Sequence, residues 1–155
     1  VGSGGPRWSR LSVVYADSCV LLATYIQEKD SDLAAERLQA ADLILTSSLT
    51  YAEVLAVLGR YKRERRIKKR RYEATCERFR IDWAKLVIVP LEVALPLIPI
   101  ITRDFSLKAG DAIHLASAAV FADLTPNFEF LTFDRRLGVA ALEKGFQLWP
   151  HPDVI

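Results

Sequence analysis

One carboxylate lies in the middle of an apolar stretch, Asp17 in the segment VVYADSCVLLA at residues 13–23. Removing an ionised carboxylate from water is costly unless hydrogen bonds or an opposite charge compensate for it. An acid at such a position therefore indicates chemistry that needs a carboxylate. Other acids placed to share its surroundings would strengthen that interpretation.

Three further acids occupy equivalent positions. Glu53 follows the apolar segment LILTSS, Asp111 opens GDAIHLASAAVFA, and Asp134 follows FEFLTF. Ligands of open parallel sheets bind outside the carboxyl ends of the strands, where these acids are expected. Four acids in one place repel one another unless cations neutralise them. Carboxylate oxygens suit Mg²⁺ or Mn²⁺ rather than zinc, and a chain with two histidines offers no nitrogen-rich metal site.

Each acid also has a purely structural interpretation. Asp17, Asp111 and Asp134 could be helix N-caps, which contribute about 0.5–2 kcal/mol each. Thr50 and Glu53 in TYAE form a capping-box pattern. Capping explains any one of the acids well enough. The occurrence of four acids at equivalent points is what favours a shared metal site.

The apolar pattern predicts the elements that would position these acids. Short runs rich in β-branched residues predict five strands, at 12–16, 43–46, 86–89, 128–132 and 146–148. Longer segments predict helices at 19–28, 31–41, 50–71, 72–84, 109–122 and 135–144. Pro96 and Pro99 predict a broken helix at 91–105. The result is an α/β fold with a mostly parallel central sheet of about five strands flanked by helices, in which 50–84 form a protruding helical hairpin.

The length of 155 residues fits a single domain at 12–155. Residues 1–11, rich in glycine and serine, are expected to be a flexible leader or a tag remnant. The most apolar stretch, 86–101, is too short to span a membrane and contains Glu92, so a buried core segment is expected. The two cysteines form no disulfide or metal-ligand pattern and fit a reducing, cytoplasmic compartment.

The four acidic motifs resemble those of PIN-domain ribonucleases, and most closely those of the VapC toxins of bacterial and archaeal toxin–antitoxin pairs. The motifs are Asp17 in VVYADSCVLL, Glu53 in TSSLTYAEVL, Asp111 in LKAGDAIHLASA and Asp134 in FLTFDRRL. The resemblance covers about residues 12–150. It departs from the family at Cys19, where Asn or Ser is more usual, and at the two prolines, where a regular helix is more usual.

This resemblance implies a PIN-like fold and a metal-dependent endoribonuclease that hydrolyses RNA phosphodiester bonds. Asp17, Glu53, Asp111 and Asp134 would be both the catalytic residues and the ligands of Mg²⁺ or Mn²⁺. The partners that it implies are an RNA substrate, a cognate VapB-type antitoxin and a second copy of the chain, with no role for a membrane.

Two polar residues near the acids are accessory candidates. Ser18 and Thr132 could orient metal-bound waters, although a helix cap and a strand position explain them as well. His114, one turn after Asp111, is interpreted as a hydrogen-bonded core residue.

The basic segment 60–80 is the second functional candidate. It holds 11 Lys or Arg and 3 Glu, a local charge of +8, so the rest of the chain carries −6 of the net +2. Positive charge beside an acidic site would bind RNA phosphates, and the candidate contacts are Arg65, Arg66, Lys68 and Lys69. A solvated helix face or a protein-docking surface is the alternative use.

Two other functions stay open on sequence alone. One is a non-catalytic PIN-fold module that binds RNA or protein, against which the four intact acids argue. The other is a receiver-type domain with Asp17 as phosphate acceptor, which would need a second acid beside Asp17.

Overall fold

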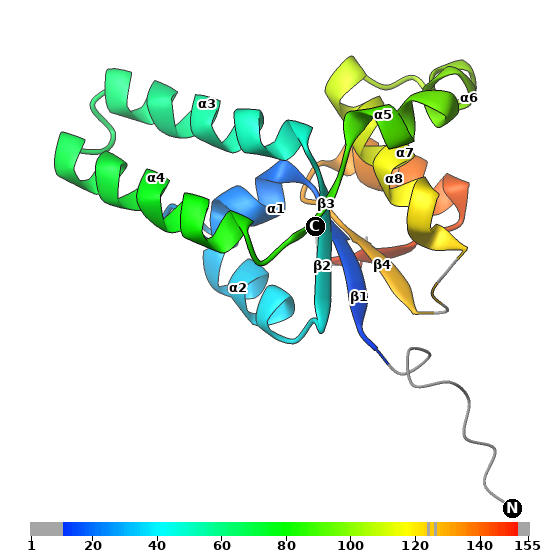
Figure 1. The fold of residues 1–155 in the computed structure, drawn as a ribbon, viewed down its shortest axis with the longest axis horizontal. Coiled ribbons are helices and arrows are strands. Elements are labelled where there is room, and N and C mark those ends of the chain that lie inside the picture. The colour runs from blue at the N-terminus through cyan, green and yellow to red at the C-terminus, as the bar shows by residue number, and fades with distance from the viewer. Residues whose placement is uncertain (1–10, 124, 126, 152–155) are drawn as a thin grey trace, which may run out of the picture.

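The computed structural model describes residues 11–123, 125 and 127–151, so most of the predicted leader and the last four residues lie outside it. Five parallel strands form one sheet in the order β3-β2-β1-β4-β5 (Figure 1). The strands are β1 (Val13–Ala16), β2 (Leu43–Ser47), β3 (Val87–Val89), β4 (Phe128–Leu131) and β5 (Gln147–Trp149). The predicted α/β fold is therefore confirmed.

Helices connect successive strands and cover both faces of the sheet. They are α1 (Ser18–Ala23), α2 (Ser31–Gln39), α3 (Leu49–Arg63), α4 (Lys69–Trp83), α5 (Leu91–Ala94), the 3₁₀ helix η2 (Leu95–Leu97), α6 (Ile98–Asp104), α7 (Ala109–Ala122) and α8 (Arg135–Lys144). The predicted bounds of α7 and α8 are confirmed. The first predicted helix, at 19–28, is wrong at its end because α1 closes at Ala23, where the Thr24 hydroxyl donates to the Leu21 carbonyl.

The central strand β1 is buried on both sides, and its side chains alternate between two cores. Val13 and Tyr15 pack with residues of α7 and α8, and the Tyr15 ring stacks on Phe130 at 5.2 Å between centroids. Val14 and Ala16 point the opposite way and pack with residues of α1 and α2. Burial on both faces explains why the strand reads as a continuous apolar run.

Helices α3 and α4 form the predicted hairpin, which extends to one side of the sheet (Figure 1). Its own core surrounds the fully buried Phe79, which contacts Tyr25, Tyr51 and Trp83. The predicted bounds of 50–71 and 72–84 are wrong, because α3 ends at Arg63 and α4 begins only at Lys69.

A turn of basic residues separates the two helices of the hairpin. Arg65 adopts a left-handed conformation with φ 57°, and the N–H of Arg66 donates to the carbonyl of Tyr61 at 2.9 Å. Lys and Arg are good helix formers, so residue type gave no sign of this turn.

The predicted broken helix at 91–105 is confirmed as the succession α5, η2 and α6. The expectation that this apolar stretch is buried is wrong in part, since Val93, Leu95 and Ile100 are exposed. Within the part of the chain that the structure describes, no helix is long and apolar enough to cross a membrane.

Candidate active site

Asp17 lies between β1 and α1 at the carboxyl end of the central strand, and only 3% of it is exposed. Its Oδ1 accepts hydrogen bonds from the backbone N–H of Val20 at 3.1 Å and from the thiol of Cys19 at 2.8 Å. Burial raises the pKa of Asp17, although His114 and the hydrogen-bond donors partly oppose that rise. The structure thus keeps a carboxylate where ionisation is costly.

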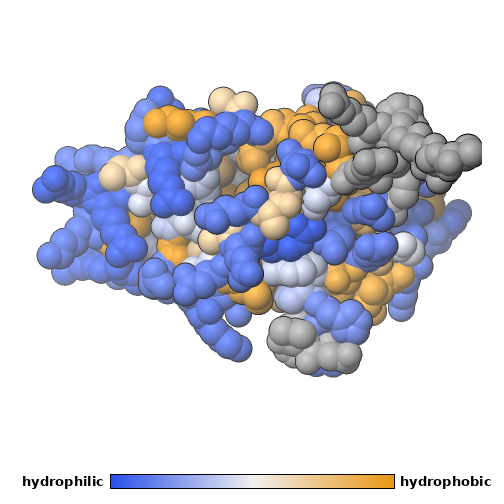
Figure 2. All heavy atoms as spheres, turned by 90° about the horizontal axis from the view of Figure 1, so that it is seen from below, coloured by the Kyte–Doolittle hydropathy of each residue, from blue (hydrophilic) through white to orange (hydrophobic). Residues whose placement is uncertain are grey.

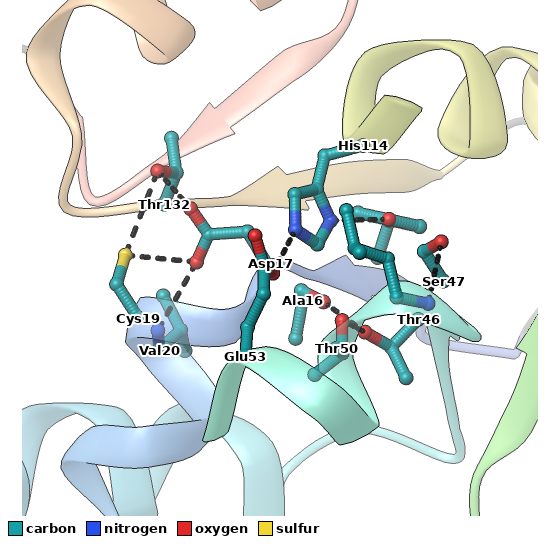
Figure 3. A network of polar contacts seen from close by, with 12 residues as sticks. Ala16, Asp17, Cys19, Val20, Thr46, Ser47, Thr50, Glu53, His114 and Thr132 are labelled. Atoms are coloured by element: carbon teal, nitrogen blue, oxygen red, sulfur yellow. Dashed lines mark hydrogen bonds and ion pairs between the residues drawn. The ribbon is translucent and has the colours of Figure 1, made fainter. Parts of the chain in front are cut away.

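Thr132 connects the first and fourth acids. Its buried hydroxyl donates to Oδ2 of Asp17 (Figure 3). The same hydroxyl accepts from the backbone N–H of Asp134 at 2.9 Å. Asp134 is exposed and caps α8 by accepting from the backbone N–H of Leu137 at 2.9 Å. Residues that are 115 positions apart in the sequence therefore meet because β1 and β4 are neighbouring parallel strands.

Glu53 lies in the second turn of α3, directly after the end of β2. Its Oε2 lies 2.7 Å from Nε2 of His114 (Figure 3). Nδ1 of the same ring lies 2.7 Å from the hydroxyl of Tyr15. Burial acts to raise the pKa of Glu53, but His114 and a hydrogen bond from Ser18 outweigh it, so the pKa is lowered. The pKa values of these two acids are thus shifted in opposite directions, that of Glu53 downward and that of Asp17 upward.

Asp111 lies in the first turn of α7 and is partly exposed. Burial raises its pKa, and the negative charges of Asp134 and Asp17 raise it further. The preceding residue, Gly110, lies against Glu53, because a Cβ atom built on it would stand 3.2 Å from Oε1 of Glu53. Asp17 and Asp134 thus act on Asp111 through their charges, whereas Glu53 adjoins α7 through Gly110 and His114.

The capping interpretations are confirmed for Asp17 and Asp134, each of which accepts from a backbone N–H in its helix. They are wrong for the other two acids. Residue 108, not Asp111, is the N-cap of α7. The capping box at Thr50 and Glu53 does not form, because Thr50 is buried inside α3 and its hydroxyl lies 2.8 Å from that of Thr46.

In the described part of the chain, no three His, Cys, Asp or Glu side chains are arranged to hold a metal ion as they stand. The donor set nevertheless fits a hard divalent cation in its chemistry, since four carboxylates supply only oxygen ligands. Burial, together with the negative charges of Asp134 and Asp17, raises the pKa of Asp111 more than the nearby His114 and Lys108 lower it.

Two residues beside Asp17 and Glu53 have contacts that the sequence did not predict. Cys19 replaces the more usual Asn or Ser yet still donates to Asp17, and it also accepts from the N–H of Phe133 at 3.3 Å. His114 is buried and hydrogen-bonded, as predicted for a core residue, but one of its partners is the site carboxylate Glu53. The sequence signal for His114 was its position one turn after Asp111.

The basic candidates do not lie at the acidic site. Arg65, Arg66 and Lys68 are exposed in the turn between α3 and α4, and Lys69 is exposed at the start of α4, at the far end of the hairpin (Figure 1). The rise of an α-helix places Arg63 about 15 Å from Glu53 along α3. Figure 2 shows that hydrophilic residues cover this end of the molecule.

Comparison with known proteins finds similarity along most of the chain. Residues 14–142 match the family model of the PIN domain. Two ribonucleases of Mycobacterium tuberculosis, VapC45 and VapC49, are each 30% identical over 142 residues, which cover 90% of this chain and 96% of each relative.

Solved structures share the fold at lower identity. A toxin–antitoxin complex from Klebsiella pneumoniae matches with a TM-score of 0.58 and 19% identity, over 78% of this chain and 86% of that one. VapC20 of Mycobacterium tuberculosis, a toxin that cleaves the sarcin–ricin loop, matches with a TM-score of 0.58 and 15% identity, over 86% and 95% of the two chains. VapBC2 of Rickettsia felis, bound to promoter DNA, matches with a TM-score of 0.57 and 12% identity, over 88% and 96%.

Proposed function

The chain belongs to the PIN-domain family of VapC-type ribonucleases, and we propose that it is a metal-dependent endoribonuclease, the toxin of a VapBC-type toxin–antitoxin pair in the cytoplasm. The observation that carries this proposal is the buried carboxylate of Asp17, whose charge acts on Asp111 together with that of Asp134. Glu53 joins this group through its contact with His114 on α7. A fold alone would not need so costly a charge at the end of its central strand.

We infer that these four carboxylates hold Mg²⁺ or Mn²⁺ through their oxygens. When bound, such an ion supplies an activated water and neutralises charge on the phosphate and on the leaving oxygen. The chain's own part is to orient the ligands. Both oxygens of Asp17 are held by hydrogen bonds, Oδ2 by Thr132 and Oδ1 by Cys19 and Val20.

The remaining residues act on the water and the RNA. Ser18, which hydrogen-bonds to Glu53, and Thr132, which hydrogen-bonds to Asp17, would orient a water between the acids. Because hydrolysis uses water, no side-chain nucleophile is required, and cleavage would leave 5′-phosphate and 3′-hydroxyl ends.

The decisive experiment incubates the purified protein with total cellular RNA, with Mn²⁺ or with EDTA. Cleavage should need the metal and should fall at least about 100-fold in the variant Asp17→Asn, which removes a metal ligand. Asp30→Asn is the matched control, since Asp30 also precedes a helix but its side chain forms no capping bond. Equal cleavage by Asp17→Asn, or equal cleavage in EDTA, would contradict the proposal.

The proposed partners are a VapB-type antitoxin and a second copy of the chain. The solved relatives include a toxin–antitoxin complex and a VapBC complex, which supports the first partner. The exposed apolar side chains of Val93, Leu95 and Ile100 support an interface at α5–α6. Co-purification with the neighbouring gene product and a dimer mass in solution are expected, and a persistent lone monomer would contradict both.

We further propose that the hairpin turn binds RNA phosphates through Arg65, Arg66, Lys68 and Lys69. Their exposure supports this role, as does their distance from the acids, which leaves room for several nucleotides between them. The guanidinium of Arg66 lies over the Tyr61 ring at 3.6 Å, so this side chain has a structural contact as well.

A further inference from the structure

Behind the acidic site, a buried pair of side chains connects the central strand to Glu53. Tyr15 on β1 is fully buried, and its hydroxyl lies 2.7 Å from Nδ1 of His114 on α7. The other ring nitrogen of His114 lies 2.7 Å from Oε2 of Glu53 on α3. One imidazole ring thus joins three elements that come from distant parts of the sequence.

The direction of the first hydrogen bond follows from the chemistry of a buried phenol. A tyrosine hydroxyl has an ordinary pKa of about 10, so at neutral pH this oxygen carries its proton. A buried O–H needs an acceptor. The backbone N–H of Ser47, which also interacts with this oxygen, can only donate. Ser117 lies nearby, but its buried hydroxyl has no partner within hydrogen-bonding distance and angle. Nδ1 of His114 is therefore the acceptor.

The direction of the second bond follows from the first. An imidazole nitrogen that accepts carries no proton, so the ring proton of a neutral His114 is on Nε2. Nε2–H then donates to Oε2 of Glu53, because an ionised carboxylate can only accept hydrogen bonds. Two hydrogen bonds therefore point the same way, one from the Tyr15 O–H to Nδ1 of His114 and one from Nε2–H of His114 to Glu53. We call this pair of hydrogen bonds the relay.

The second oxygen of Glu53 shows what this orientation achieves. With Oε2 engaged by His114, Oε1 faces Gly110 at the start of α7, one residue before Asp111. We propose that Tyr15 and His114 are positioning residues, a one-directional hydrogen-bond relay that fixes Glu53 so that one oxygen is presented toward Asp111 for metal binding. This inference rests on the proposed nuclease function.

The state of the ring can be measured directly in the metal-free protein. In ¹⁵N-labelled protein at neutral pH, the imidazole nitrogens should show a bare Nδ1 and a protonated Nε2 for His114. The chain has two histidines, so the variant His114→Gln assigns the signals. A proton on Nδ1 of the wild type would overturn the relay. This measurement needs neither a substituted protein that folds nor any activity.

Two substitutions of His114 separate the donor to Glu53 from the contact with Tyr15. In His114→Gln the side-chain amide can reach the position of Nε2 and still donate to Glu53. In His114→Asn the amide reaches only the position of Nδ1. We expect the Mn²⁺ concentration for half-maximal binding, followed by the electron paramagnetic resonance of free Mn²⁺, to rise about tenfold in His114→Asn and much less in His114→Gln. Equal values for the two variants would overturn the relay.

Tyr15→Phe removes the first donor and leaves the ring. It should also raise the Mn²⁺ requirement several-fold. Tyr61→Phe is the matched control, since Tyr61 donates to Glu28 at 2.9 Å in the hairpin and should have no effect. In a Glu53→Gln background, Tyr15→Phe should change nothing further, and a full additional effect there would overturn the relay.

The same measurements distinguish the relay from the nuclease proposal. A protein that binds Mn²⁺ and shows the expected ring proton but cleaves no RNA refutes the nuclease and leaves the relay standing. A protein that cleaves RNA with Mn²⁺ while Tyr15→Phe behaves like Tyr61→Phe refutes the relay alone.

Discussion

Asp17 shows at the scale of one residue how a fold accommodates a costly charge. Three donors surround its oxygens, yet its pKa is raised, because burial outweighs them. A carboxyl whose pKa is higher in the folded than in the unfolded protein favours folding in its protonated form. Stability without metal should therefore fall as the pH rises from the usual carboxyl range through the raised pKa of Asp17.

The substitution Asp17→Asn tests this linkage in a chelator. Asn cannot ionise and still offers one oxygen to Val20 and Cys19, so it should stabilise the metal-free protein at pH 8 by about 1 kcal/mol. The difference should shrink toward pH 4, where the wild-type carboxyl is protonated. Urea unfolding at the two pH values measures it. A destabilised variant at pH 8 would show that the hydrogen bonds of the carboxylate outweigh its burial.

His114 illustrates a different lesson at the same scale. Its type and spacing were compatible with a core residue, and its burial agrees. Whether a buried histidine contacts another core residue or a site carboxylate depends on what stands opposite it, and here that is Glu53.

At the scale of elements, α7 approaches the start of α3 at Gly110, a residue without a side chain. A Cβ atom on Gly110 would lie 3.2 Å from Oε1 of Glu53 and 3.8 Å from Leu49. The first distance is tighter than an ordinary contact, so Glu53 would have to shift by a few tenths of an ångström. Because His114 holds its other oxygen, that shift would disturb the orientation of the carboxylate.

We therefore expect Gly110→Ala to lower RNA cleavage about fivefold while changing stability by less than about 1 kcal/mol, since the gain in helix propensity offsets part of the crowding. Gly59→Ala in α3 is the control. Its Cβ atom would meet only the end of the Arg63 side chain at 3.4 Å, so it should stabilise by about 0.5–1 kcal/mol and leave cleavage unchanged. Cleavage rates and urea unfolding of both variants test this prediction, and equal cleavage by Gly110→Ala and Gly59→Ala would contradict it.

The hairpin shows where element prediction from pattern fails. The apolar spacing of Phe79, Tyr61 and their neighbours identified two helices that pack together, and the buried cluster confirms it. The turn between the helices was misplaced because Arg65 and its basic neighbours have helix-forming side chains in a non-helical segment. The chain reverses there because the two apolar faces must meet, which is a tertiary requirement.

At the scale of the whole molecule, charge is separated between an acidic site and a basic hairpin turn. Residues 60–80 carry +8 and the remainder −6. Such a separation suits a polyanion that lies along the hairpin and enters the acidic site at one phosphate.

Reversing charge at the turn tests this arrangement. The double variant Lys68→Glu/Lys69→Glu should weaken single-stranded RNA binding and lower the slope of log affinity against log salt by about 1–1.5. Lys29→Glu/Lys144→Glu makes the same change in net charge at exposed lysines elsewhere. Equal losses in the two double variants, measured by salt titration, would mean that net charge rather than the hairpin turn attracts RNA.

The sequence by itself determined the α/β fold, the hairpin and the positions of the four acids relative to strands and helices. These features follow from local periodicity and from the rule that parallel strands end at one edge. The tertiary structure alone decided which side chains touch, such as Thr132 with Asp17 and His114 with Glu53. Contacts of that kind depend on strand register and on the rotation of each helix, which packing sets and no local pattern records.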